Sequence, residues 1–250
     1  RKCVGILFVV CLMASSAFAT NSWTASTGSW GTATGWWNGT VQKVPDDTEQ
    51  AKILGGTVCT LDYAAPAMLA NKITVGTSAT MAEWRIVSGG SITSGVEVQV
   101  GDASNKIGKV VQTGGTLNLS GGAGKSKLEV GYKNTTGSYT ISGGSIIGAA
   151  AISQLLVGCS GSVNGGNGTF TVQGMGGSIS AAYLYVACQT ATATYTGNGT
   201  LAFEINGGIS AIQAGSVYID PLAQAAAIAT LNVTKTGALP SGDILLINNT

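Results

Sequence analysis

Short segments of alternating apolar and polar residues recur along the chain. In one set of triplets the two outer residues are always aliphatic, whereas the middle residue varies among Thr, Gln, Glu, Leu and Tyr. A period of two residues is typical of a β-strand with one buried face. We therefore expect the outer residues to face a core and the middle residue to face solvent in the triplets Ile73-Thr74-Val75, Val98-Gln99-Val100, Leu128-Glu129-Val130, Leu155-Leu156-Val157, Leu184-Tyr185-Val186 and Val217-Tyr218-Ile219.

A pair of glycines followed by Ser or Thr and an aliphatic residue keeps step with these triplets. The pairs recur at intervals of 25 to 34 residues, with an alternating segment before each pair and a shorter one after it. Glycine allows a positive φ and so permits a sharp corner. The pairs are Gly55-Gly56, Gly89-Gly90, Gly114-Gly115, Gly143-Gly144, Gly176-Gly177 and, in a weaker copy, Gly207-Gly208.

Two marks in one phase at this spacing indicate a solenoid. Each repeat offers a first strand before the glycine pair, a second strand after it and a third strand formed by the triplet, with no helical stripe between them. The expected fold is all-β, a right-handed parallel β-helix of about six coils with three short strands per coil. The handedness follows the rule for crossovers between parallel strands.

The ends of the chain differ from the repeat. Two basic residues, an apolar run over 4–13 and Ala17-Phe18-Ala19 are typical of an export signal, and the run is too short to span a bilayer. We divide the chain into a signal peptide (1–19), an N-terminal cap (20–52), the β-helix (53–220) and the start of a further coil or a truncated C-terminal segment (221–250). The sequence therefore predicts a fragment of a longer exported protein.

The cap carries Trp23, Trp30, Trp36 and Trp37. A solenoid needs an atypical terminal unit to shield its open end, so we interpret the tryptophans as a plug for the first coil. The alternative is a tryptophan platform that binds sugars.

Composition removes one class of partner. The chain has 38 glycines and 9% charged residues, and its net charge is +1 with scattered Lys and Arg. Nucleic-acid binding requires clustered basic residues, so we exclude it.

The opening Trp30…Trp36-Trp37…Val44-Pro45, followed by serial Gly-Gly-Ser/Thr and Leu-x-Val-Gly units, resembles exported bacterial β-helical proteins. These are the autotransporter-associated β-strand repeat and PEP-CTERM-type surface proteins. The resemblance covers about residues 1–220 and implies an adhesin-like or structural stalk segment at the bacterial envelope, without catalytic residues. It also implies an extracellular glycan or a cell-surface protein as partner. Contact with the membrane would come only through the signal peptide or a C-terminal anchor outside this chain.

Catalysis is the sharper alternative, since β-helices also serve as polysaccharide lyases and hydrolases. Such chemistry needs carboxylate pairs or calcium-binding carboxylates. The chain has no histidine, and of its eleven acids only Asp46, Asp47 and Glu49 cluster, in a segment that we interpret as a solvated turn. We expect no two acids of the repeat to converge on one face. The prediction is a non-enzymatic protein without cofactor or metal, and the alternative is a carbohydrate-active or glycan-binding protein whose site lies outside this fragment.

The middle position of the third strand supplies a candidate contact surface. Tyr185 and Tyr218 hold it in successive coils, and Leu156 lies one coil earlier. Such a stripe suits contact with a sugar ring or a partner, although packing between coils explains it equally well.

Three cysteines follow the signal peptide. Cys159 and Cys188 occupy the same corner of adjacent coils, where equivalent Cα atoms lie about 4.8 Å apart, within the range of a disulfide. We predict that they can bridge, leaving Cys59 free. Asp102 and Tyr132 hold this corner in earlier coils, so coincidence is the alternative.

Overall fold

The computed structural model describes residues 19–63, 68–102, 106–119, 127–132, 134–148, 154–158, 166–173, 177–186, 198–205, 210–219, 228–235 and 245–249. For residues 68–69, 177–178, 180–186 and all described residues from 198 onward, only the backbone is described. The described part is all-β, with one short 3-10 turn, η1 (Ala33–Gly35), and no α-helix. No helix in it is long and apolar enough to cross a membrane.

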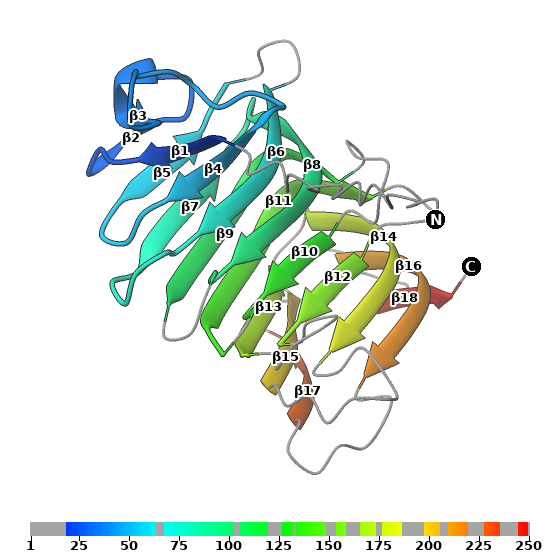
Figure 1. Cartoon of the computed structure of the whole chain (residues 1–250). Helices are drawn as coiled ribbons and strands as arrows, with labels where there is room; N and C mark the ends of the chain where they lie inside the picture. Colours follow the sequence, from blue (N-terminus) through cyan, green and yellow to red (C-terminus); the bar gives the residue numbers. More distant parts are fainter. Residues whose placement is uncertain are drawn as a thin grey trace, which may run out of the picture.

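Among the described residues, eighteen strands join in one sheet (Figure 1). They are β1 (Ala19–Trp23), β2 (Thr27–Ser29), β3 (Trp36–Trp37), β4 (Glu49–Ile53), β5 (Val58–Leu61), β6 (Met68–Val75), β7 (Ala82–Ile86), β8 (Ser91–Val100), β9 (Ile107–Leu119), β10 (Lys127–Val130), β11 (Thr136–Gly148), β12 (Gln154–Val157), β13 (Asn167–Gln173), β14 (Gly177–Val186), β15 (Asn198–Ile205), β16 (Ser210–Ile219), β17 (Ile228–Lys235) and β18 (Leu245–Asn249).

The strands wind into a β-solenoid of about four turns, and all pairs are parallel except β1 with β3. Strands of successive turns pair in three ladders. The first ladder runs β2-β5-β7-β9-β11-β13-β15-β17, the second β6-β8-β9-β11-β14-β16-β18, and the third β1-β4-β6-β8-β10-β12-β14-β16. The solenoid predicted from the repeat is therefore confirmed.

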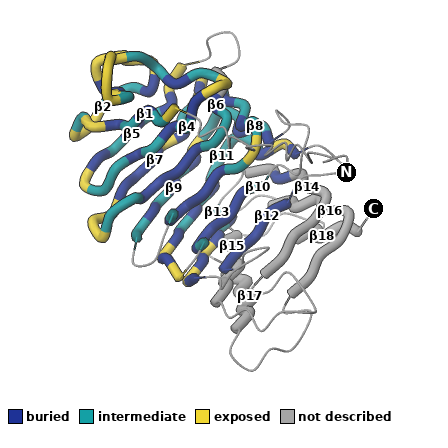
Figure 2. The backbone as a smooth tube through the Cα atoms, in the orientation of Figure 1, coloured by how far each residue is buried: buried dark blue, intermediate teal, exposed yellow. Residues whose placement is uncertain are grey.

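The core lies inside the coils (Figure 2), and the register of the third ladder matches the predicted alignment. Leu128 pairs with Leu155, which pairs with Leu184, which pairs with Val217. The side chains of Leu128 and Leu155 are buried in the core; those of the other two lie outside the described side chains. A slip of one residue would place Glu129 in the hydrophobic core in place of Leu128, so the apolar character of the core face fixes the register.

The strands of a turn are less separate than expected. The first and second strands are continuous through the glycine pair in β9 and in β11, and the ladder between them shifts register around Gly143. The second glycine of that pair, Gly144, has φ +80°, so the corner is a local bend within a strand rather than a loop between two strands. Backbone pairing can persist through such an irregularity.

A second line of glycines, not singled out in the sequence, runs along the first ladder. Gly108, Gly137 and Gly168 pair with one another in successive turns. A Cβ on Gly137 would lie 2.3 Å from the backbone nitrogen of Gly131, whose φ is +78°. Two backbone segments of the coil meet here too closely for any side chain.

The N-terminal segment partly follows the repeat. β1 pairs in register with β4, and β2 pairs with β5, so both extend the ladders by one rung. β3 folds back on β1, which brings the buried rings of Trp23 and Trp36 to a centroid distance of 5.3 Å. Trp30 lies between Trp36 and Trp84, at 4.7 and 5.6 Å. The predicted boundary between cap and β-helix at 52/53 falls within β4.

Candidate functional site

The middle residues of the third ladder form one continuous line, which we call the outer line. Thr74, Gln99, Glu129 and Leu156 occupy successive rungs, and the backbones of Tyr185 and Tyr218 continue in register. The two tyrosines thus share one register position. Their side chains lie outside the described side chains, so a contact role for them stays a prediction.

The outer line is buried, whereas the sequence predicted that it faces solvent. Thr74, Gln99, Glu129 and Leu156 are all buried, although none of the four belongs to the hydrophobic core that contains their neighbours on either side. Alternation along a strand determines the face on which a side chain lies, but not what covers that face, and parallel strands are commonly buried on both faces. The interpretation of Leu156 as an accessible contact residue is therefore wrong.

Glu129 is the unusual member of the outer line. Its carboxylate accepts a hydrogen bond from Nε2 of Gln99 at 2.9 Å, and Nζ of Lys127 lies 3.7 Å away. Only 1% of its side chain is exposed. Desolvation on burial raises the pKa of Glu129 above its usual value, and the nearby carboxylate of Glu97 adds to this effect.

Glu97 and Glu129 therefore correct a second expectation. Both extend from the face of the third ladder that points away from the core, on adjacent strands, and they interact electrostatically. Two acids of the repeat do converge on one face. Glu97 forms an ion pair with Lys72 at 2.5 Å, and Glu129 is inaccessible, so this pair presents no carboxylate acid and base to a substrate.

The first ladder carries a charged hollow on its outer face. Arg85 donates a hydrogen bond to Glu83 at 2.5 Å, and Lys109 of the next rung donates another at 3.0 Å. Burial alone would raise the pKa of Glu83, but these two bonds outweigh it and lower the pKa. With Val87, Val111 and Thr113 the three residues line a hollow of about 330 Å³.

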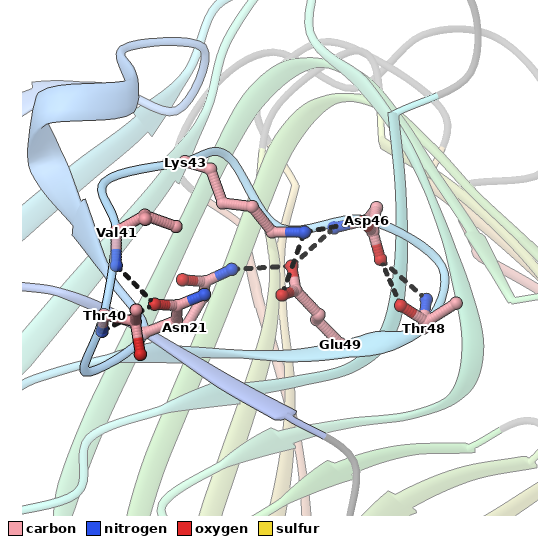
Figure 3. Close-up of polar contacts among 8 residues, drawn as sticks. Asn21, Thr40, Val41, Lys43, Asp46, Thr48 and Glu49 are labelled. Carbon is pink, nitrogen blue, oxygen red and sulfur yellow. Dashed lines mark hydrogen bonds and ion pairs between the residues drawn. The ribbon is translucent and has the colours of Figure 1, made fainter.

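Two acids of the predicted cluster, Asp46 and Glu49 at the start of β4, belong to one network of hydrogen bonds and ion pairs (Figure 3). The Asp46 carboxylate accepts hydrogen bonds from both the hydroxyl and the backbone N–H of Thr48, and these bonds, with one from Lys43, lower its pKa to about 2. Glu49 accepts a bond from Asn21 at 2.6 Å and pairs with Lys43 at 3.0 Å. The hydrogen bond that the backbone N–H of Thr48 donates to the Asp46 carboxylate is typical of a turn, as the sequence predicted, but Glu49 is buried rather than solvated.

No group of three or more metal-ligating side chains occurs among the described residues. Cys59 is buried and unpaired, and desolvation raises the pKa of its thiol. Cys159 and Cys188 lie outside the described residues. The pairing of Val157 with Val186, two positions earlier in each case, is described, and the disulfide itself stays a prediction.

Comparison with protein-family models, with curated proteins and with solved structures finds no match to this chain. The family resemblance stated for the sequence therefore stays a prediction.

Proposed function

We propose that the chain is a non-enzymatic segment of an exported bacterial surface protein, acting as an adhesin-like element or a structural stalk. The observation that carries the proposal is the parallel pairing of successive turns, from β1 to β16 in the third ladder and from β6 to β18 in the second. Such a stack forms a stiff rod, in which each turn contacts only its neighbours. The described acids that come together are buried or held in ion pairs, which favours a structural role over catalysis.

The finer architecture belongs to the same proposal. The winding is right-handed, by the crossover rule, and the β-helix of residues 53–220 comprises six coils. The tryptophan cluster closes its N-terminal end, and this closure is supported by the burial of Trp23, Trp30 and Trp36.

The cellular location of the protein provides a test of this proposal. The full-length protein is expressed in a bacterium, and intact cells are treated with a protease that cannot enter them. We expect the mature protein to begin at Thr20 by N-terminal sequencing and to be degraded on intact cells. An Ala19→Arg variant, which removes the small residue before the cleavage point, should accumulate as precursor. A protein that stays protected inside cells and keeps residues 1–19 would contradict the proposal.

Glycan binding is the second candidate, favoured by the shared register position of Tyr185 and Tyr218. Aromatic residues on neighbouring rungs offer a stacking surface for sugar rings. A glycan array probed with the wild type and with a Tyr185→Ala/Tyr218→Ala double variant tests it. Equal signals from the two proteins would exclude the stripe as the binding surface.

A further inference from the structure

A pocket of about 380 Å³ lies where the cap meets the first ladder. Its lining comes from two segments, Ser29, Gly31 and Thr32 from the end of β2 onward, and Asp62 and Tyr63 directly after β5. The volume falls within the range of about 300–1,000 Å³ that small-ligand sites occupy. The residues that line this pocket differ from those that line the charged hollow and those that form the outer line.

The backbone of the pocket is fixed on both sides. Trp30 donates a backbone hydrogen bond to the carbonyl of Thr60 at 2.7 Å, and Val87 donates one to Leu61 at 3.1 Å. The carbonyl of Tyr63 accepts a bond from Ser91 at 3.4 Å. The residues before Asp62 and Tyr63 are therefore held between neighbouring rungs, and Trp30 beneath them is part of the buried tryptophan cluster.

The carboxylate of Asp62 is oriented by one partner and retains capacity for others. The hydroxyl of Ser29 donates to its Oδ1 at 2.5 Å across the rung. An ionised carboxylate offers about four lone-pair sites, so Oδ2 and part of Oδ1 remain available to a hydroxyl-bearing ligand. Asp62 forms no ion pair with a described residue.

Tyr63 supplies the apolar surface of the pocket. The residue is 52% exposed, and with Trp37 it is one of the exposed large aromatic residues of the described part. A tyrosine ring offers a flat apolar face with a polar tip, which matches the C–H face of a pyranose ring and its hydroxyl rim. The Asp62 carboxylate, without an ion-pair partner among the described residues, repels anionic ligands and accepts hydrogen bonds from neutral hydroxyls.

We propose that the Asp62–Tyr63 pocket binds a neutral pyranose unit of an extracellular polysaccharide. Tyr63 stacks on the ring, and Asp62, oriented by Ser29, accepts hydrogen bonds from two of its hydroxyls. Thr32, at the rim, offers a further hydroxyl. This proposal rests on the proposed function, because only an exported surface protein would encounter extracellular polysaccharides. It places the glycan contact at the N-terminal end of the solenoid rather than at Tyr185 and Tyr218.

Isothermal titration calorimetry of the purified full chain tests the pocket. The probes are a soluble neutral β-glucan, a neutral mannan and, as the anionic comparison, polygalacturonate. We expect binding of at least one neutral polymer with a Kd in the millimolar range, and weaker or no binding of polygalacturonate. Tyr63→Ala and Asp62→Asn should each weaken binding by about tenfold, whereas Tyr63→Phe should retain most of it because the ring is kept.

Matched controls separate the pocket from general surface effects. Trp37→Ala removes another exposed aromatic ring, and Asp47→Asn neutralises another exposed aspartate; neither residue lines the pocket, and both variants should bind as the wild type does. Thermal melting should show that all variants fold, since the changed side chains are exposed.

Three results would overturn the proposal: no binding of either neutral polymer, unchanged binding by Tyr63→Ala, or tighter binding of polygalacturonate, which would indicate the cations of the charged hollow instead. Because the measurement uses purified protein, failure here leaves the surface location untouched. A protected, cytoplasmic protein would in turn defeat the proposed function even if the pocket bound sugar.

Discussion

Glu129 contributes to the pH dependence of stability in the opposite sense to Asp46 and Glu83. The pKa of Glu129 is raised in the folded chain by desolvation, so the folded state binds its proton more tightly than the unfolded state. The stabilising effect of that proton is therefore fully present below about pH 4.3, the ordinary glutamate pKa, and is lost as the pH rises through the raised value. Asp46 and Glu83, with lowered pKa values, act in the opposite direction.

The Glu129→Gln variant isolates this effect. Its free energy of unfolding, measured by urea denaturation from pH 4 to pH 7, should exceed that of the wild type at pH 7, and the difference should shrink toward pH 4. The contributions of Asp46 and Glu83 cancel in the difference. Parallel curves for the two proteins would show that Glu129 titrates normally.

A substitution of Val157 tests whether the core face of the third ladder is buried. It is fully buried in β12, so Val157→Asp places an unpaired carboxylate in the core and should lower the free energy of unfolding by several kcal/mol. Val96→Asp serves as the control, because Val96 is 44% exposed, and it should change stability by less than about 0.5 kcal/mol. Similar losses in both variants would refute the burial of Val157 in the core.

For individual residues, the sequence predicts the face of the strand on which a side chain lies better than it predicts whether that face is exposed. Alternation correctly placed Leu128 and Leu155 in the core, because a two-residue period is a local property of the strand. It failed for Gln99 and Glu129, whose burial depends on what lies over the outer line. The pocket at Asp62 and Tyr63 was missed for a similar reason, since it joins segments about 30 residues apart through the pairing of β2 with β5.

The elements of the coil depend on close backbone contacts. Gly137→Ala would place a Cβ 2.3 Å from backbone atoms of Gly131 and Val100, which no side-chain rotation can relieve, so we expect a loss of about 1–3 kcal/mol or more. Gly95→Ala, within β8, meets its nearest atoms only at 3.3 Å and should cost less than about 1 kcal/mol. Chemical denaturation of both variants gives the comparison, and equal stabilities would exclude a tight contact at Gly137.

Strand number was the less accurate part of the element prediction. Glycine pairs were interpreted as corners between separate strands, yet β9 and β11 continue through them because ladder pairing resumes on both sides of the bend. The glycines of the first ladder did leave a signal in the sequence, as the second residue of each first strand in Ile107-Gly108, Thr136-Gly137 and Asn167-Gly168. Only a three-dimensional register explains why glycine is required there.

At the scale of the molecule, a truncation tests whether the N-terminal segment caps the stack. Removal of residues 20–52 deletes β1, β2, β3 and most of β4, and exposes the edge of β6 and the ring of Trp84. Open parallel edges act as templates for further pairing, so the truncated protein should aggregate, as seen by light scattering. A monomeric truncated protein with unchanged melting would contradict a capping role.

Point variants offer a milder form of the same test. Trp36→Ala removes a fully buried ring and should cost about 3–5 kcal/mol, whereas Trp37→Ala, in the same short strand but 44% exposed, should be close to neutral. Thermal melting compares the two variants.

Because every turn pairs in register with the turns before and after it, each repeat adds one fixed step to the length of the rod. Duplication or loss of one whole repeat keeps each surviving pair of neighbours intact and changes the rod by about 4.8 Å, without a new core. An insertion within a strand leaves residues without their partners, whereas the corners already vary in length, since the glycine pairs recur at intervals of 25 to 34 residues. The number of whole repeats therefore sets the length of the rod, and a change in copy number can tune its reach.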